Sequence, residues 1–75
     1  MIMPWHRADS NTLSRREIDV LKLLAQGKRD KEMAQALGIS WRTVGHQVRS
    51  AMLKLDSDTR AQAVAIYVKR ETGAH

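Results

Sequence analysis

The side chains best suited to chemistry in this sequence are the basic residues spaced through positions 41–55. At about 100° per residue of an α-helix, Arg42, His46 and Arg49 fall on one side of this stretch. Positions 41–55 hold no acidic residue, so these side chains have no negative charge beside them in the sequence. Arginine donates through a planar fork that fits guanine in the major groove. The spacing therefore predicts a DNA-binding surface, although on the helix alone a solvated basic helix without a partner stays open.

The opposite side of the same stretch is apolar and is expected to face the core. An amphipathic helix of this kind buries one stripe and exposes the other. The predicted buried stripe consists of Val44, Val48, Ala51, Met52 and Leu55.

A short helix and a tight turn are expected to precede and position this helix. The helical pattern over 31–37 ends at Gly38, where glycine adopts a left-handed backbone at low cost. Ile39 is the expected plug between the two helices, and the Ser40 hydroxyl is a strong N-cap candidate. Helix, turn and helix in this order indicate a helix-turn-helix, whose second helix enters the major groove in DNA-binding versions.

Another helix is predicted ahead of this pair, over 14–26. Ser14 followed by Glu17 is a capping box, in which each residue satisfies a backbone N–H of the other. Gly27 marks the end of the helix. Asp30 is the best available N-cap for the short helix that follows.

The last helix is expected from about position 59 to 69, capped by Ser57 or Asp58. Its sequence is apolar nearly all the way round, so burying one face leaves an apolar strip exposed, which usually marks an interface. The alternative is a terminal helix with ordinary exposed alanines. The predicted dimer contacts are Ala61, Val64, Tyr67 and Val68.

Composition limits the function further. The 75 residues carry a net charge of +5 and no cysteine, which points to a polyanion, nucleic acid first and an anionic membrane surface second. The chain has no apolar run long enough for a membrane span and no signal-peptide pattern, so we expect a cytoplasmic protein acting at the nucleoid, with no membrane partner. Three scattered histidines fit no metal site, and no nucleophile with a base, paired carboxylate site or Gly-rich phosphate loop is present. We therefore expect no metal, no cofactor and no enzymatic activity.

The expected architecture is all-α, with four helices in one domain. Residues 1–12 show no periodicity and are interpreted as a flexible arm or linker. Residues 13–70 would form the helix-turn-helix domain, and residues 71–75 a polar tail.

Several motifs extend over residues 13–68. They are Leu13-Ser14-x-Arg16-Glu17, Val20-Leu21-x-Leu23-Leu24-Ala25-x-Gly27, Lys31-Glu32-Met33-Ala34, Leu37-x-Ile39-Ser40-x-x-Thr43-Val44, Lys54-Leu55 and Arg60-x-Gln62-Ala63-Val64. On these motifs the chain resembles the LuxR/GerE-type (NarL/FixJ) helix-turn-helix transcriptional regulators. The resemblance implies a four-helix domain that binds inverted-repeat double-stranded DNA as a homodimer, pairing through its last helix. Such a domain typically ends a larger regulator, and RNA polymerase stays open as a further partner.

The resemblance also implies roles for individual positions. It implies that positions 45, 46 and 49 enter the groove, and the residues expected to read bases are Arg49 first, then His46 and, from its place on the outward face, Arg42, with Gly45 at the remaining groove position. It implies phosphate contacts for Thr43, Lys31 and Lys54. Phosphate contacts are also expected of Arg16, Gln47 and Arg29, from their positions and side-chain chemistry.

Three positions depart from the family pattern. Gly45 stands where Lys or Arg is common, which removes a contact and costs about 1 kcal/mol of helix propensity. Gln47 replaces a common His, and Arg29 replaces an N-capping Ser or Thr. Two alternatives stay open: a protein-interaction adaptor or anti-activator built on the same fold, and a module like region 4 of a sigma factor.

Overall fold

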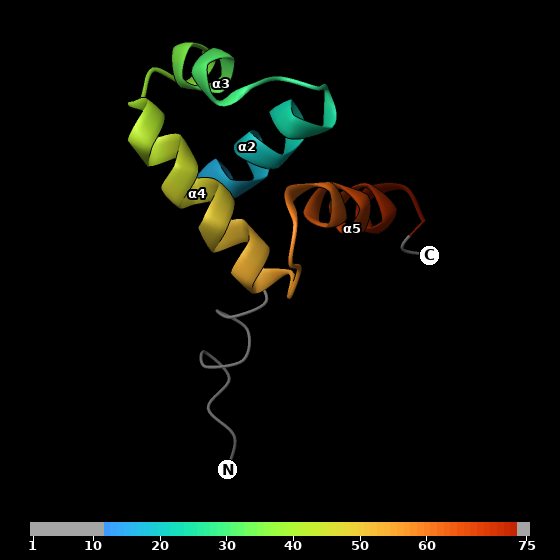
Figure 1. Ribbon diagram of the computed structural model, residues 1–75. Helices are drawn as coiled ribbons and strands as arrows, with labels where there is room; N and C mark the ends of the chain where they lie inside the picture. Colours follow the sequence, from blue (N-terminus) through green and yellow to red (C-terminus); the bar gives the residue numbers. More distant parts are fainter. Residues whose placement is uncertain (1–11, 74–75) are drawn as a thin grey trace.

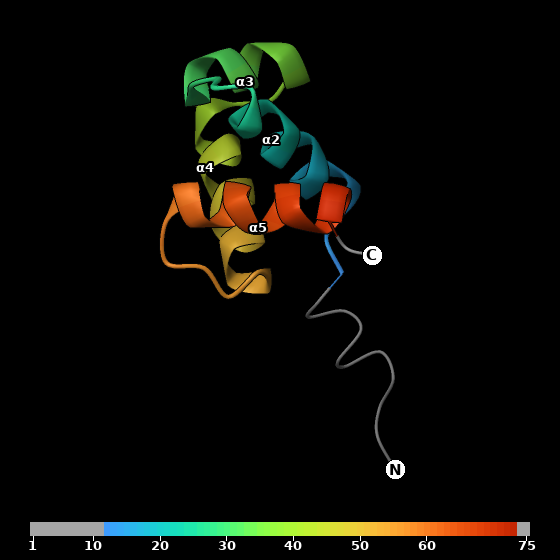
Figure 2. The same cartoon turned by 90° about the vertical axis from the view of Figure 1, so that its right-hand side faces the viewer.

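Four helices and no strand make up residues 12–73, the part of the chain that the computed structural model describes. They are α2 (Arg15–Ala25), α3 (Asp30–Leu37), α4 (Trp41–Lys54) and α5 (Arg60–Gly73). In Figure 1 the long α4 runs down one side of the molecule, with α2 beside it and α3 at its upper end. Figure 2 shows α5 lying across the molecule, where it contacts both α2 and α4. The all-α prediction with four helices is confirmed.

Hydrogen bonds close both ends of α2 as the sequence predicts. Ser14 Oγ accepts from the N–H of Glu17 at 3.1 Å, and Glu17 Oε1 accepts from the N–H of Ser14 at 2.8 Å. At the other end, Gly27 has a left-handed φ of 84°, and its N–H donates to the carbonyl of Leu24 at 2.9 Å. The capping box and the terminal glycine therefore fix where the chain enters and leaves α2.

The turn between α3 and α4 also forms as predicted. Gly38 adopts a left-handed φ of 66°, a conformation that a residue with a Cβ avoids. Ile39 is partly buried against the core, and its N–H donates to the carbonyl of Ala34 at 3.1 Å. Ser40 Oγ accepts from the N–H of Thr43 at 3.0 Å and caps α4.

Aliphatic side chains fill the core in two clusters that meet along α2 and α4. The α5 cluster, between α2, α4 and α5, contains Leu21, Ala51, Leu55, Ala63 and Tyr67. The α3 cluster, between α2, α3 and α4, contains Val20, Met33, Val44 and Val48. Leu24 and Met52 are partly buried and pack against both clusters. The predicted stripe of α4 thus faces the core, with Met52 its least buried member.

The N-cap prediction for α3 is wrong. The N-cap is Arg29, whose side chain makes no capping hydrogen bond, and Asp30 is the first residue of the helix. The N–H of Arg29 donates to Glu32 Oε1 at 2.8 Å, so one backbone donor is still satisfied. The carboxylate of Asp30 caps no helix and instead binds the guanidinium of Arg60 at the start of α5.

The start of α5 differs from the prediction as well. Thr59 caps the helix, since its Oγ1 accepts from the N–H of Gln62 at 3.0 Å, and neither Ser57 nor Asp58 does so. The side-chain oxygen of Gln62 in turn accepts from the N–H of Asp58 at 2.7 Å. The helix then continues to Gly73, beyond its expected end.

Two terminal predictions fall mostly outside the described residues. The arm over 1–12 lies outside them apart from Thr12, and the tail over 71–75 is helical as far as Gly73. Within residues 12–73, no helix combines the length and the apolar character that crossing a bilayer requires.

Candidate nucleic-acid interface

The outward face of α4 carries the two arginines and the histidine that the sequence singles out. Val44 is fully buried and Val48 is 2% exposed, whereas Arg42, His46 and Arg49 are exposed. Within the described part of the chain, none of these three side chains forms an ion pair. The face therefore presents uncompensated positive charge to solvent, on a helix anchored along its other side.

The N-terminal end of α4 adds backbone donors to this charge. Thr43 is partly buried, and its hydroxyl lies 2.8 Å from the Ser40 hydroxyl inside the cap. A helix N-terminus carries partial positive charge and attracts phosphate groups. The predicted phosphate role of Thr43 is thus compatible with its position.

The other predicted phosphate contacts come from three helices. Lys31 in α3 and Arg29 just before it are exposed, while Arg16 in α2 and Gln47 in α4 are partly buried. Lys31 lies near the start of α4, since it lines one hollow of about 420 Å³ together with Trp41. Residues from the first turns of α3 and α4 therefore border the same hollow.

Gly45 is a gap in the outward face. It lies within α4, and a Cβ built there would meet nothing within 4 Å. No close backbone approach therefore requires glycine at this position, and the missing side chain leaves open space on the surface expected to face DNA.

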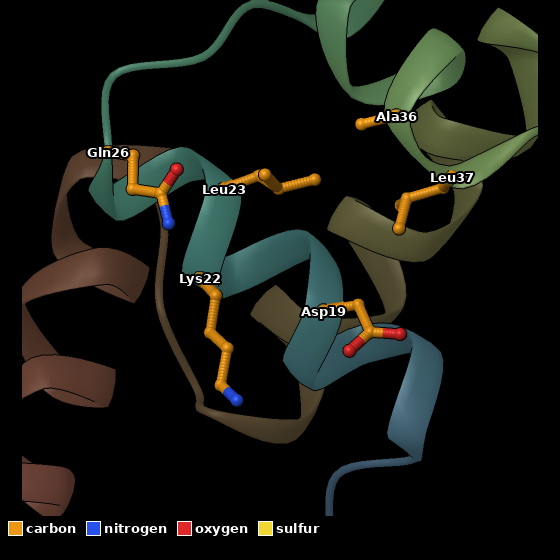
Figure 3. Close-up of a pocket in the computed structure, with 6 residues that line it drawn as sticks. All are labelled: Asp19, Lys22, Leu23, Gln26, Ala36 and Leu37. Carbon is orange, nitrogen blue, oxygen red and sulfur yellow. The ribbon is translucent and has the colours of Figure 1, made fainter.

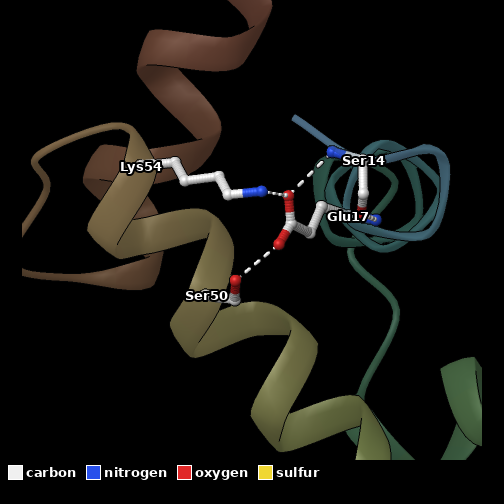
Figure 4. A network of polar contacts seen from close by, with 4 residues as sticks. All are labelled: Ser14, Glu17, Ser50 and Lys54. Carbon is white, nitrogen blue, oxygen red and sulfur yellow. Dashed lines mark hydrogen bonds and ion pairs between the residues drawn. The ribbon is translucent and has the colours of Figure 1, made fainter. Parts of the chain in front are cut away.

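Lys54 occupies a different place from the one expected of a phosphate contact. Its Nζ lies 2.9 Å from Glu17 Oε1, and its side chain is only 27% exposed. Figure 4 shows Glu17 held between Lys54, Ser50 and Ser14, with α4 contributing the first two. The ammonium is thus paired with a carboxylate of the same chain and joins α4 to α2, and the phosphate contact of Lys54 stays a prediction.

Glu17 is a buried carboxylate with every polar contact satisfied. Its side chain is 4% exposed. Burial by itself raises the pKa of Glu17, but hydrogen bonds from Ser50 and Ser14 and the bond and charge of Lys54 outweigh it. The resulting pKa lies below its ordinary value of 4.5, so the group is ionised at neutral pH. The network positions α4, which carries the basic face.

A second ion pair joins the first turns of α3 and α5. Arg60 Nη2 donates to Asp30 Oδ2 at 2.9 Å, and the second guanidinium nitrogen binds the other carboxylate oxygen. Hydrogen bonding to Arg60 holds the pKa of Asp30 below its ordinary value, and the same contact raises the pKa of Arg60. This two-point contact fixes the start of α3 relative to α5.

The predicted dimer surface on α5 needs one correction. Tyr67 belongs to the α5 cluster and is only 6% exposed, because it lies on the face that packs against α2 and α4. Burial raises the pKa of its hydroxyl, with a smaller contribution from Glu71. The other three residues face outward: Ala61 is exposed, Val64 is partly buried and Val68 is 40% exposed. The outward strip of α5 is defined here as Ala61, Val64 and Val68.

A hollow of about 350 Å³ lies between α2 and α3. Its described lining residues are Asp19, Lys22, Leu23, Gln26, Ala36 and Leu37. Figure 3 shows Leu23 pointing across it toward Ala36 and Leu37, while the Lys22 side chain extends along α2, away from α3.

Residues 12–73 also contain no cluster of three or more histidine and acidic side chains that could hold a metal. The basic face of α4 is therefore the better candidate for a functional surface.

Sequence reasoning missed two features of this region. The ion-pair partners of Glu17 and Asp30, Lys54 and Arg60, lie 37 and 30 positions away, and no local spacing signals them. Trp41 was not assigned a role, although it is 71% exposed at the start of α4. No local signal identifies it, because at 100° per residue Trp41 has the same helical phase as the apolar stripe of α4.

A buried stripe, a glycine turn and an exposed basic face on the second helix define the class of protein, a helix-turn-helix domain. The GerE family, described as bacterial regulatory proteins of the luxR family, matches residues 11–67. The chain belongs to this family, and its relatives are DNA-binding transcriptional regulators.

Three relatives illustrate the similarity. The spore germination protein GerE of Bacillus subtilis is 46% identical over 52 residues, which are 69% of this chain and 70% of that protein. The uncharacterized transcriptional regulatory protein YhcZ of Bacillus subtilis is 47% identical over 57 residues, 76% of this chain and 27% of that protein. The HTH-type transcriptional activator RamA of Corynebacterium glutamicum is 41% identical over 64 residues, 85% of this chain and 23% of that protein.

The match covers only part of most of these relatives. The chain spans 23% of RamA and 28% of the transcriptional regulatory protein LiaR of Bacillus subtilis, about a quarter of each. No solved structure matches the chain.

Proposed function

We propose that this chain is the sequence-specific DNA-binding domain of a transcriptional regulator, with α4 lying in the major groove. The observation that carries the proposal is the outward face of α4, where Arg42, His46 and Arg49 are exposed without ion pairs among the described residues. A helix fits the major groove, where each base pair shows a distinct pattern of donors and acceptors. Its site of action would be nucleoid DNA in the cytoplasm.

Arg49 is the proposed principal base reader, with His46 and Arg42 secondary. Arg49 lies in the middle of α4, two turns beyond Arg42, and is held in register by the buried Val48 beside it. Its guanidinium can donate two parallel hydrogen bonds to guanine. A base contact of this kind discriminates between sequences, whereas phosphate contacts fix only position.

Backbone contacts are proposed for Thr43, Lys31, Arg16, Gln47 and Arg29. They are distributed over α2, α3 and α4 and over the capped N-terminus of α4. Contacts from several helices would hold the domain at one depth and angle on the duplex.

The dimer is proposed to form through the outward strip of α5. Ala61, Val64 and Val68 follow the helical spacing i, i+3 and i+7, which places them on one face. Pairing two copies through this strip would suit an inverted repeat, with half-site centres about 10 bp apart. RNA polymerase remains a further proposed partner.

The test is selection of duplexes from a random pool, followed by titration of the recovered site and of a scrambled duplex at several salt concentrations. Arg49→Ala should weaken binding to the recovered site by ~1–3 kcal/mol and relax one base pair. Lys31→Ala is the matched control, since it should weaken both duplexes alike and reduce the salt slope by about 1. Equal losses on both duplexes for Arg49→Ala would contradict the proposed base contact.

A second candidate function is an adaptor that pairs with another regulator through α5. The empty surface at Gly45 and the outward strip of α5 favour it. Recovery of no preferred duplex, together with stable binding to a full-length regulator, would establish this alternative. The family match removes the support for a sigma-factor region 4 module.

A further inference from the structure

Trp41 is a large apolar side chain that the core does not use. It is 71% exposed at the first position of α4. Most described apolar side chains of α4 point inward, and the other large exception is Leu53, 74% exposed near the C-terminal end. An exposed indole offers a large apolar face of the kind that is enriched at interfaces, and its surroundings indicate what it can contact.

Two hollows border the indole. Among the described residues, Trp41 and Lys31 line one of about 420 Å³, and Trp41 and Arg42 line another of about 260 Å³. The indole shares one hollow with a lysine proposed to contact phosphate and another with an arginine proposed to reach bases. Trp41 therefore lies where the proposed interface passes from phosphate contacts to contacts with base edges.

Gly45 extends the free space next to this indole. Residues four apart are neighbours on a helix surface, and a helical side chain covers the turn before its own Cα. A side chain at position 45 would therefore cover part of the turn that carries Trp41, and at Gly45 no such side chain exists. The gap leaves one edge of the Trp41 turn open toward the groove.

We propose that Trp41 is a specificity-determining residue that contacts the 5-methyl group of a thymine in the major groove. Thymine is the base that presents an apolar methyl group there, and apolar side chains recognise it by contact. The flanking Lys31 and Arg42 would bind the neighbouring polyanion while the indole covers the methyl group. In this interface Trp41 replaces the side chain missing at position 45. The inference rests on the proposed DNA-binding function and adds one base preference to it.

The experiment uses the duplex recovered by selection with the full chain. Each thymine is replaced in turn by deoxyuridine, which removes only the methyl group, and binding is measured for the wild type and for Trp41→Ala. One buried CH2 is worth about 0.8 kcal/mol, so losing the contacted methyl should weaken wild-type binding about fourfold at one position. Trp41→Ala should bind the thymine and deoxyuridine duplexes equally at that position.

Leu53→Ala is the matched control. Leu53 is as exposed as Trp41 and lies on the same helix, about 18 Å along the axis at 1.5 Å per residue. It should keep the fourfold difference at the position that Trp41→Ala loses. Both side chains are exposed, so neither substitution should unfold the domain, and circular dichroism checks this.

The possible outcomes distinguish a failure of the thymine contact from a failure of the proposed DNA-binding function. A selected site whose deoxyuridine substitutions affect wild type and Trp41→Ala equally would overturn the thymine contact and leave DNA binding intact. Failure to recover any preferred site would overturn the proposed function and the thymine contact with it. A methyl-dependent position that disappears only in Trp41→Ala supports both.

Discussion

Replacing Lys54 with methionine should destabilise the fold without removing a DNA contact. Methionine keeps the apolar stem but removes the ammonium, which lies 2.9 Å from the Glu17 carboxylate. Glu17 would then be a charged group, 4% exposed, with hydrogen bonds from Ser50 and Ser14 but no cation. The loss should appear in the free energy of unfolding.

The magnitude follows from the burial of the two partners. Breaking a fully buried ion pair costs ~3–5 kcal/mol, and a hydrogen bond to a charged group is worth ~1.5–3 kcal/mol. Because the Lys54 side chain is 27% exposed, the lower range applies, and we expect about 2 kcal/mol. For a domain of this size that lowers Tm by about 8–16 °C.

A double-mutant cycle with Glu17→Gln isolates the ion pair. The glutamine Oε1 can still accept from Ser14 and from Lys54, and its amide can donate to the Ser50 hydroxyl. The network stays satisfied but loses its negative charge. Lys54→Met should therefore cost only about 0.5 kcal/mol in the Glu17→Gln background, leaving a coupling energy near 1.5 kcal/mol.

The assay is urea unfolding at neutral pH, followed by far-ultraviolet circular dichroism. An equal cost of Lys54→Met in both backgrounds would refute the ion-pair explanation. DNA binding, measured where all variants are folded, gives the second readout. The salt slope of Lys54→Met should match the wild type, and a fall of about 0.9 would mean that Lys54 does contact a phosphate.

Three further predictions concern stability. Gly45→Ala should raise the free energy of unfolding by about 1 kcal/mol, because a helical glycine is replaced and its Cβ meets open space. Gly38→Ala should lower it by about 1–2 kcal/mol, because φ is 66° there; urea unfolding of both variants tests the opposite signs. Stability should also fall as the pH drops from neutral to below the ordinary carboxyl pKa, because Glu17 and Asp30 have lowered pKa values and the unfolded chain then binds more protons. Urea midpoints across this range should fall less steeply for Glu17→Gln, and a midpoint that rises on acidification would contradict the sign.

Local signals made most of the helices predictable. The Ser14 box, the glycines at 27 and 38 and the Ser40 cap each depend on residues within a few positions, where sequence spacing is also spatial proximity. The apolar stripe of α4 has a clear helical phase and was predicted correctly. The base-reading and phosphate roles at this face remain predictions.

Contacts between distant segments were not predictable from one sequence. Lys54 was expected on DNA from the family resemblance. Its ion pair with Glu17 was not predictable, because that contact depends on how α2 packs against α4. Asp30 was expected to cap its own helix. Its actual partner, Arg60, belongs to a different helix, and no local spacing indicates that contact. Tyr67 was misplaced because α5 is apolar nearly all round, so its sequence does not identify which face is buried.

The division of the core into two clusters has a consequence for how the domain opens. We expect that α5 can separate from α2 and α4, which opens the α5 cluster, while the α3 cluster that joins the helices of the helix-turn-helix remains packed. Amide protons of α5 should therefore exchange with solvent through a partial opening that costs less than global unfolding, whereas those in the middle of α2 and α4 should require it. The proposed pairing surface on α5 and the proposed base-reading surface on α4 would then belong to separate cooperative units, so that pairing can weaken while each copy stays bound to DNA.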